Sequence, residues 1–149
     1  MQRRDLLQTA AGSVALLSLA ALGEEQKAAA SAPPPPAKGE PLNAALYDAA
    51  LACLRAGDIC LEHCVKSLSA GEKMMAECAG TVRQMLPLCG ALSELAVQRS
   101  AHLKELAVVC AKVCRECEAA CKKHANHHPE CKACMESCQK CAAECEKLA

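Results

Sequence analysis

The sequence predicts an all-α protein, an antiparallel up-down-up-down four-helix bundle with a core lined by cysteine. From residue 42 to residue 148, Ala, Leu, Glu, Lys and Cys dominate, and no alternation of β-branched residues marks a strand. Gly and Pro are sparse in this range. The helical stretches have comparable lengths and short connections, which favours antiparallel neighbours.

The N-terminal segment, residues 1–30, resembles a twin-arginine signal peptide. Arg3 and Arg4 precede an apolar stretch that is too short and too rich in Ala, Gly and Ser to predict a membrane span. Small residues place the cleavage after Ala30. We expect export of a folded protein to the periplasm, without membrane association once the signal is removed; an N-terminal amphipathic or anchor helix is the alternative.

The next segment, residues 31–41, is rich in proline and predicts an extended linker. Residues 42–149 then form the predicted bundle domain. Its first helix is expected over about 42–68 and ends at a break beside Gly71.

The second helix is predicted over about 71–97. Ser69 and Glu72 have the spacing of a capping box that would open it. Pro87 lies inside this helix and predicts a kink, because it removes one backbone donor.

The last two helices are separated by a loop that contains Pro129. We expect the third helix to begin after residues 98–100 and to continue to about Ala125. Pro129 suits the first turn of the fourth helix, which is expected to end near Lys147.

Composition excludes several kinds of function. The chain has 17 basic and 17 acidic residues, and Tyr47 is its one aromatic residue. No basic stripe with stacking aromatics is present, so we expect no nucleic-acid partner. No catalytic triad, carboxylate pair or glycine-rich phosphate loop is recognisable, so we expect no enzymatic activity.

The cysteines recur at helical spacing. Five of them fall within residues 131–145 at intervals of three, four, three and four, which places them on one face of the fourth helix. The other predicted helices show similar stripes, so all the thiols can face one axis. The predicted metal-binding thiols are Cys53, Cys60, Cys64, Cys78, Cys89, Cys110, Cys114, Cys117, Cys121, Cys131, Cys134, Cys138, Cys141 and Cys145.

Three chemistries compete for these thiols. Disulfides fit poorly within a helix, because neighbouring Cβ atoms are too far apart and the side chains do not converge. Four-thiolate zinc sites and iron–sulfur clusters would leave negative charge in a dry core. One Cu(I) per thiolate is neutral, so we expect many Cu(I) ions per chain. A general thiol sink for Zn or Cd, or a redox-sensing cysteine-rich protein, is the alternative.

One end of the predicted bundle is rich in weaker copper donors. The first-to-second and third-to-fourth connections should lie at the same end, which would bring His63, Met74 and Met75 near the histidines of residues 124–128. We expect His63 and at least one of the two methionines to line an entrance for copper.

The cysteine stripes, the stretch "CLEHC" at residues 60–64 and the Met-containing start of the second helix resemble the bacterial copper storage protein family. The resemblance covers about residues 42–147. It implies storage of Cu(I) inside the bundle, for supply to copper enzymes or for detoxification, with a copper chaperone or copper enzyme as partner. It also implies a homotetramer, and a branch of the family exported through a twin-arginine signal.

Overall fold

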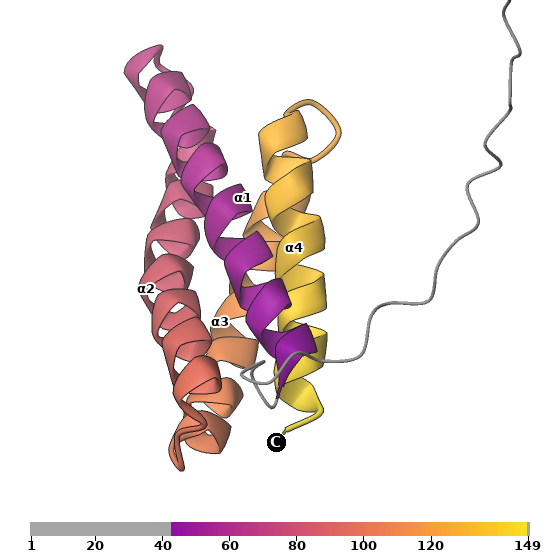
Figure 1. Ribbon diagram of the computed structural model, residues 1–149. Coiled ribbons are helices and arrows are strands. Elements are labelled where there is room, and N and C mark those ends of the chain that lie inside the picture. Colours follow the sequence, from indigo (N-terminus) through magenta and orange to yellow (C-terminus); the bar gives the residue numbers. More distant parts are fainter. Residues whose placement is uncertain (1–42, 149) are drawn as a thin grey trace, which may run out of the picture. The chain divides into compact units, whose positions relative to one another are not determined.

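The computed structural model describes residues 43–148, which fold as a four-helix bundle (Figure 1). Every regular element in this range is helical, as the sequence predicts. The elements are α1 (Ala44–Ser69), the short 3₁₀ helix η1 (Lys73–Met75), α2 (Ala76–Gln98), α3 (Leu103–Lys122) and α4 (Pro129–Glu146).

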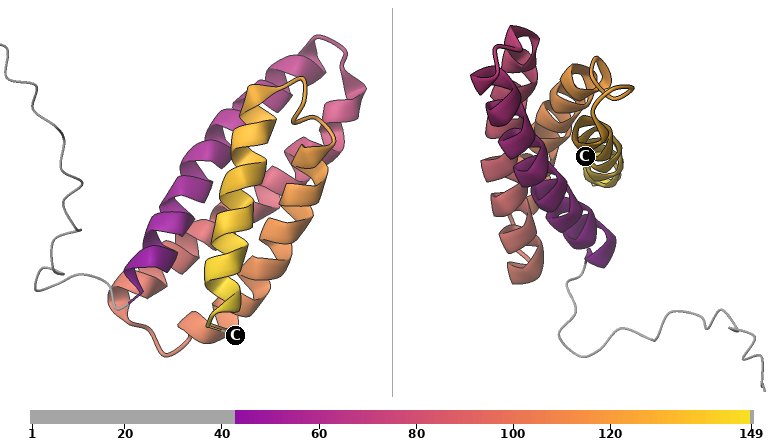
Figure 2. Two further views of the ribbon diagram at one scale, coloured as in Figure 1. Left: turned by 90° about the vertical axis from the view of Figure 1, so that its right-hand side faces the viewer. Right: turned by 90° about the horizontal axis from the view of Figure 1, so that it is seen from above.

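The helices are antiparallel to their neighbours. The α1–α2 and α3–α4 connections lie at the upper end of the bundle in Figure 1, and the α2–α3 connection lies at the lower end. In the left view of Figure 2, α4 lies in front, with α1 on one side of it, α3 on the other and α2 behind. Each helix packs against the next one in the chain, and α1 packs against α4 to close the ring. The predicted topology is therefore confirmed.

The α1–α2 boundary forms differently from the sequence prediction. Ser69 belongs to α1, and its hydroxyl donates to the carbonyl of Val65 at 2.9 Å. The Ser69 hydroxyl therefore bonds within α1 and does not cap the following helix, so the predicted capping box with Glu72 is wrong. Gly71 ends α1 instead, with φ of 95°. Its N–H donates to Leu68, and the next N–H donates to Ser67, which is the pattern of a Schellman cap.

The other boundaries lie close to their predicted positions. α2 continues past Pro87 to Gln98, so the proline does not end the helix. Arg99 adopts a left-handed conformation, with φ of 54°, between α2 and α3. Pro129 is the first residue of α4, as predicted, and its fixed φ suits that position.

The core changes in composition along the bundle. Cysteine fills its middle and the end at the α1–α2 and α3–α4 connections. Apolar side chains, among them Leu46, Ala96, Leu103 and Ala107, fill the opposite end. The thiol-lined part of the core is thus closed at one end by ordinary apolar packing. No helix within residues 43–148 combines the length and apolar character needed to cross a bilayer.

Candidate metal centre

All fourteen thiols are buried and face the core. Each cysteine side chain is 0% exposed, and none forms a disulfide. The three- and four-residue spacing explains this placement, because residues at that spacing share one helical face. Each cysteine predicted as a metal ligand therefore lies in the core.

The core around the thiols contains no Lys, Arg, Asp or Glu among the buried residues of the range 43–148. The buried polar side chains there are Ser67, Ser93, Ser137 and His124. The Ser93 and Ser137 hydroxyls donate to carbonyls of their own helices, at 2.8 and 2.9 Å. No protein cation is thus placed to balance a thiolate, so charge balance must come from bound cations.

The sulfur atoms approach one another mainly between helices. The distance between Sγ atoms is 3.3 Å for Cys78 and Cys121, and 3.5 Å for Cys53 and Cys138. Cys89 lies 3.7 Å from both Cys110 and Cys114. A disulfide needs about 2.05 Å, so these sulfurs are separate donors. Two sulfurs that bind one ion through bonds of about 2.3 Å lie about 3.8 to 4.6 Å apart, so small movements would let these pairs share an ion.

The thiols form five overlapping groups in which all sulfurs lie within 4.8 Å of one another. Two groups have four members: Cys53, Cys89, Cys114 and Cys141, and Cys60, Cys64, Cys78 and Cys131. Three groups have three members: Cys60, Cys121 and Cys134; Cys110, Cys141 and Cys145; and Cys117, Cys134 and Cys138.

Shared members connect these groups into a continuous column. Cys60, Cys134 and Cys141 each belong to two groups. Cys60 and Cys134 link three of the groups, and Cys141 links the other two. The contact between Cys53 and Cys138 then joins these two sets. The arrangement is a chain of shared donors that extends along the bundle, which differs from a set of isolated tetrahedral sites.

Burial and neighbouring thiols keep part of this column protonated. Burial, followed by the proximity of Cys60 and Cys78, raises the pKa of the Cys64 thiol. Hydrogen bonds with Cys110 and Cys114, among others, and then burial raise the pKa of Cys89. Because metal binding needs the thiolate, an ion that binds these residues must displace a proton.

Histidines gather at the end where α1 and α4 meet the connections. His63 Nε2 and His128 Nδ1 lie 2.8 Å apart and share a hydrogen bond. His63 Nδ1 lies 3.7 Å from a carboxylate oxygen of Glu130. The ring of His124, which is 7% exposed, meets that of His128 edge-on. A surface groove beside His63 is lined by Asp58, Glu62 and Glu130 and by Lys66, which pairs with Glu62 at 3.1 Å, so its charge is negative on balance.

The two predicted methionine donors differ in exposure. Met74 is 74% exposed, whereas Met75 is fully buried in the core that contains the thiols. His127 is exposed to solvent. The structure thus brings together His63, His124 and His128, and it buries Met75 but not Met74.

A further sulfur lies beside the column. Met85 is not among the metal ligands predicted from the sequence, but its Sδ lies 3.4 Å from Cys53 Sγ. The signal available in the sequence was its position four residues before Cys89, on the cysteine-bearing face of α2.

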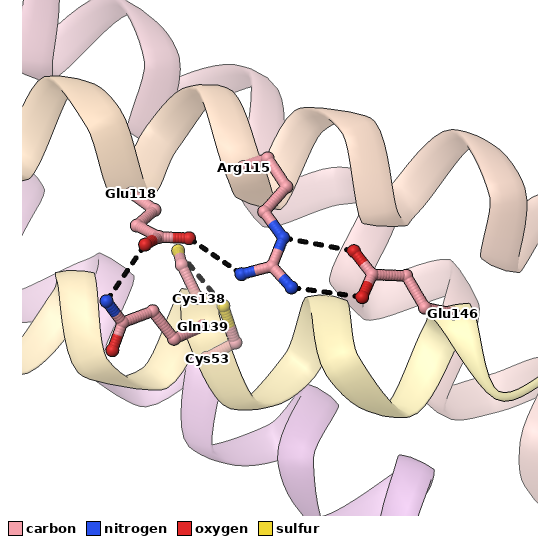
Figure 3. Close-up of polar contacts among 6 residues, drawn as sticks. All are labelled: Cys53, Arg115, Glu118, Cys138, Gln139 and Glu146. Atoms are coloured by element: carbon pink, nitrogen blue, oxygen red, sulfur yellow. Dashed lines mark hydrogen bonds and ion pairs between the residues drawn. The ribbon is translucent and has the colours of Figure 1, made fainter.

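The outer surface of the α3–α4 pair carries a charged network (Figure 3). Arg115 donates from Nε and Nη2 to both carboxylate oxygens of Glu146, at 3.0 Å each, and from Nη1 to Glu118 at 2.9 Å. Gln139 donates to the other oxygen of Glu118 at 2.8 Å. Charges are thus paired outside the bundle, while sulfur occupies its interior.

The fold and the site define a class: a four-helix bundle with a column of buried thiol donors suited to soft metal ions. A family model described as copper storage protein matches residues 40–149, and the chain belongs to this family.

Known relatives agree with this assignment. The chain is 30% identical over 98 residues to the uncharacterized cysteine-rich protein YhjQ of Bacillus subtilis (strain 168), covering 65% of this chain and 86% of the relative. The structure resembles that of Cu(I)-bound copper storage protein BsCsp3, with a TM-score of 0.65, 27% identity and coverage of 70% and 95% of the two chains.

Two other solved structures are similar. Apo-Csp3 from Bacillus subtilis has a TM-score of 0.61 and 28% identity, with coverage of 70% of this chain and 96% of that one. The copper storage protein Ccsp from Streptomyces lividans, loaded with 10 copper equivalents, has a TM-score of 0.65 at 24% identity. The match covers 71% of this chain and 82% of the Ccsp chain. At this identity, the similarity supports the fold and not the function.

Proposed function

We propose that this chain is a non-enzymatic store that holds many Cu(I) ions as thiolate complexes inside its bundle. The observation that carries the proposal is a column of fourteen buried, uncrosslinked thiols without a buried Lys, Arg, Asp or Glu in the range 43–148. A low-dielectric core disfavours net charge, and one monovalent ion per thiolate leaves none. The similarity to a structure with bound Cu(I) supports the same ion.

The test is an anaerobic titration of the reduced chain with Cu(I), in the presence of a competing Cu(I) chelator. We expect more than about ten ions per chain, because nearly every thiolate can accept its own ion. Each ion should release about one proton. Saturation at about three or four ions per chain would contradict the proposal, because that number fits isolated four-thiolate sites.

A general sink for Zn²⁺ or Cd²⁺ is the second candidate. The two four-member groups favour it, since four thiols within 4.8 Å of one another match the donor set of a structural zinc site. Adding Zn²⁺ to the copper-loaded chain distinguishes the two functions. A copper store keeps its Cu(I), whereas a general sink exchanges it for zinc.

The proposal includes the route by which copper enters. His63, His124 and His128 lie at one end of the bundle, while apolar residues fill the opposite end of the core. Imidazole binds Cu(I) less strongly than thiolate does, so these side chains can pass ions inward without retaining them. Met75 is buried in the same core and offers a thioether donor.

Export, assembly and partners complete the proposal. The predicted signal peptide and linker lie outside the described residues, and Arg3 and Arg4 are the sequence features that favour periplasmic export. Changing both to Lys should retain the chain in the cytoplasm, as judged by cell fractionation. We also propose a homotetramer, to be tested by native mass spectrometry, that receives copper from a chaperone or supplies it to a copper enzyme.

A further inference from the structure

Met85 lies beside the thiol column at about the middle of α2, and the copper store described above assigns it no role. Its side chain is fully buried. Its Sδ accepts a hydrogen bond from the Cys53 thiol at 3.4 Å. Cys53 belongs to a four-thiol group with Cys89, Cys114 and Cys141. The thioether is therefore a fifth sulfur at the edge of this group.

The position of the Met85 side chain depends on Gly57. A Cβ atom at Gly57 would lie 2.6 Å from the terminal methyl carbon of Met85. Gly57 and Cys53 are one turn apart on the same face of α1, so the methyl group packs on the glycine while the sulfur faces the thiol. A glycine inside a helix lowers the stability of that helix. At position 57 this cost is offset by the space that the missing Cβ leaves for the Met85 methyl group.

The geometry suits a shared ion. Two metal–sulfur bonds of about 2.3 Å place the sulfurs about 3.8 to 4.6 Å apart. The Met85 and Cys53 sulfurs are 3.4 Å apart, so a movement of a few tenths of an ångström would admit a metal between them. Met has three rotatable side-chain bonds and adapts readily.

The charge of the donor also fits its location. A thioether is neutral, whereas every additional thiolate would bring a negative charge into a core without cationic side chains. Met85 can therefore raise the coordination number of a Cu(I) ion from two to three without changing the net charge.

We infer that Met85 is a Cu(I) ligand whose thioether sulfur shares an ion with Cys53 in the middle of the bundle. The inference rests on the proposed function, because it requires copper in the core. It differs from an entrance role, since Met85 lies among the thiols and away from the His63–His128 pair.

Selenium absorption spectroscopy tests this directly. The full chain is made with selenomethionine and with Met74→Leu, Met75→Leu and Met135→Leu, so that Met85 and the initiator Met1 are the two selenium sites left. Extended fine structure at the selenium edge is recorded before and after anaerobic loading with Cu(I). We expect copper in the first shell of selenium after loading, and its loss when Met85→Leu is added. Leu has a similar volume and no donor atom, and such changes are tolerated best in cores.

Copper analysis of the same samples separates the two hypotheses. The wild-type chain is loaded in parallel, and fewer than several bound ions per chain in that sample would contradict the proposed store. A loaded sample without copper next to selenium would overturn the inference about Met85 and leave the store intact. This comparison of one variant before and after loading does not depend on whether the Met85→Leu chain folds.

Discussion

Cys117 and Cys138 belong to one three-thiol group and lie on facing helices, α3 and α4. If each thiolate holds about one Cu(I), Cys117→Ala and Cys138→Ala should each lower the capacity by about one ion. The change removes a small buried atom, so the helix content should remain the same. Anaerobic titration and circular dichroism measure the two quantities.

Val82→Ala is the matched control, because Val82 is equally buried on the cysteine-bearing face of α2 but contributes no donor. It should lower the stability by about 1 kcal/mol or more and leave the copper capacity unchanged. If the metal-free Cys variants instead lose their helices, these residues matter chiefly for packing.

Single residues differ in how well the sequence could predict their roles. The cysteine positions follow from helical spacing alone, since an i, i+3, i+4, i+7 pattern defines one face. The hydrogen bond between His63 and His128 joins residues on different helices, and its geometry depends on how far the helices rotate. The burial of Met75 beside an exposed Met74 depends on the short η1 helix, which no motif predicted.

At the scale of one helix, Gly71 is needed for the end of α1. Its φ is 95°, and no atom lies within 4 Å of the position that a Cβ would take, so the cost of Gly71→Ala comes from the backbone. We expect a loss of about 1 kcal/mol. Gly80→Ala is the control, because Gly80 has equal space but lies within α2. It should stabilise by about 0.5 to 1 kcal/mol. Urea denaturation should therefore shift in opposite directions for the two variants.

Between helices, the Arg115 network fixes α3 against α4. Arg115→Lys keeps the charge but removes the two parallel hydrogen bonds to Glu146, so we expect a loss of about 0.5 to 1 kcal/mol. Lys66→Ala removes a single exposed pair with Glu62 within α1 and should cost less, about 0.3 to 0.5 kcal/mol. Equal effects of the two changes in thermal denaturation would show that the bidentate geometry contributes nothing.

The elements themselves were largely predictable. Local composition and the breaks at Gly71 and Pro129 gave the helix positions. The capping-box prediction failed because a Ser within a helix can satisfy its hydroxyl with the carbonyl four residues earlier, and a motif of two residues does not distinguish this from a cap. The Schellman cap found instead has one sign in the sequence, the glycine at position 71.

At the scale of the whole molecule, the two ends of the bundle differ in chemistry. Copper that enters at the histidine end should meet His63 before Cys64 and the other buried thiols. We therefore expect His63→Ala to slow copper uptake several-fold without changing the final capacity, since the thiols remain. Stopped-flow mixing with a Cu(I) chelator complex measures the rate. His102→Ala, at the opposite end of the bundle, is the control and should leave the rate unchanged.

The protonation of the core couples the stability of the metal-free bundle to pH. Burial and nearby thiols raise the pKa of Cys64 above its ordinary value of 9.0. Below about pH 9 this thiol is neutral in both the folded and the unfolded chain, and its contribution to stability is fully present. Above pH 9 the unfolded chain loses the proton while the folded chain retains it, so folding becomes less favourable. The loss is about 1.4 kcal/mol per pH unit until the pH reaches the folded pKa.

The variant Cys64→Ala isolates this contribution. The difference in free energy of unfolding between the reduced, metal-free chain and Cys64→Ala should be constant from pH 7 to about pH 8 and should shift against the wild-type chain above about pH 9. Denaturation under reducing, anaerobic conditions measures it. A difference that stays constant to pH 11 would mean that Cys64 ionises as easily in the bundle as in the unfolded chain. Copper loading replaces the proton with a bound ion, so the loaded protein should lack this decline above pH 9.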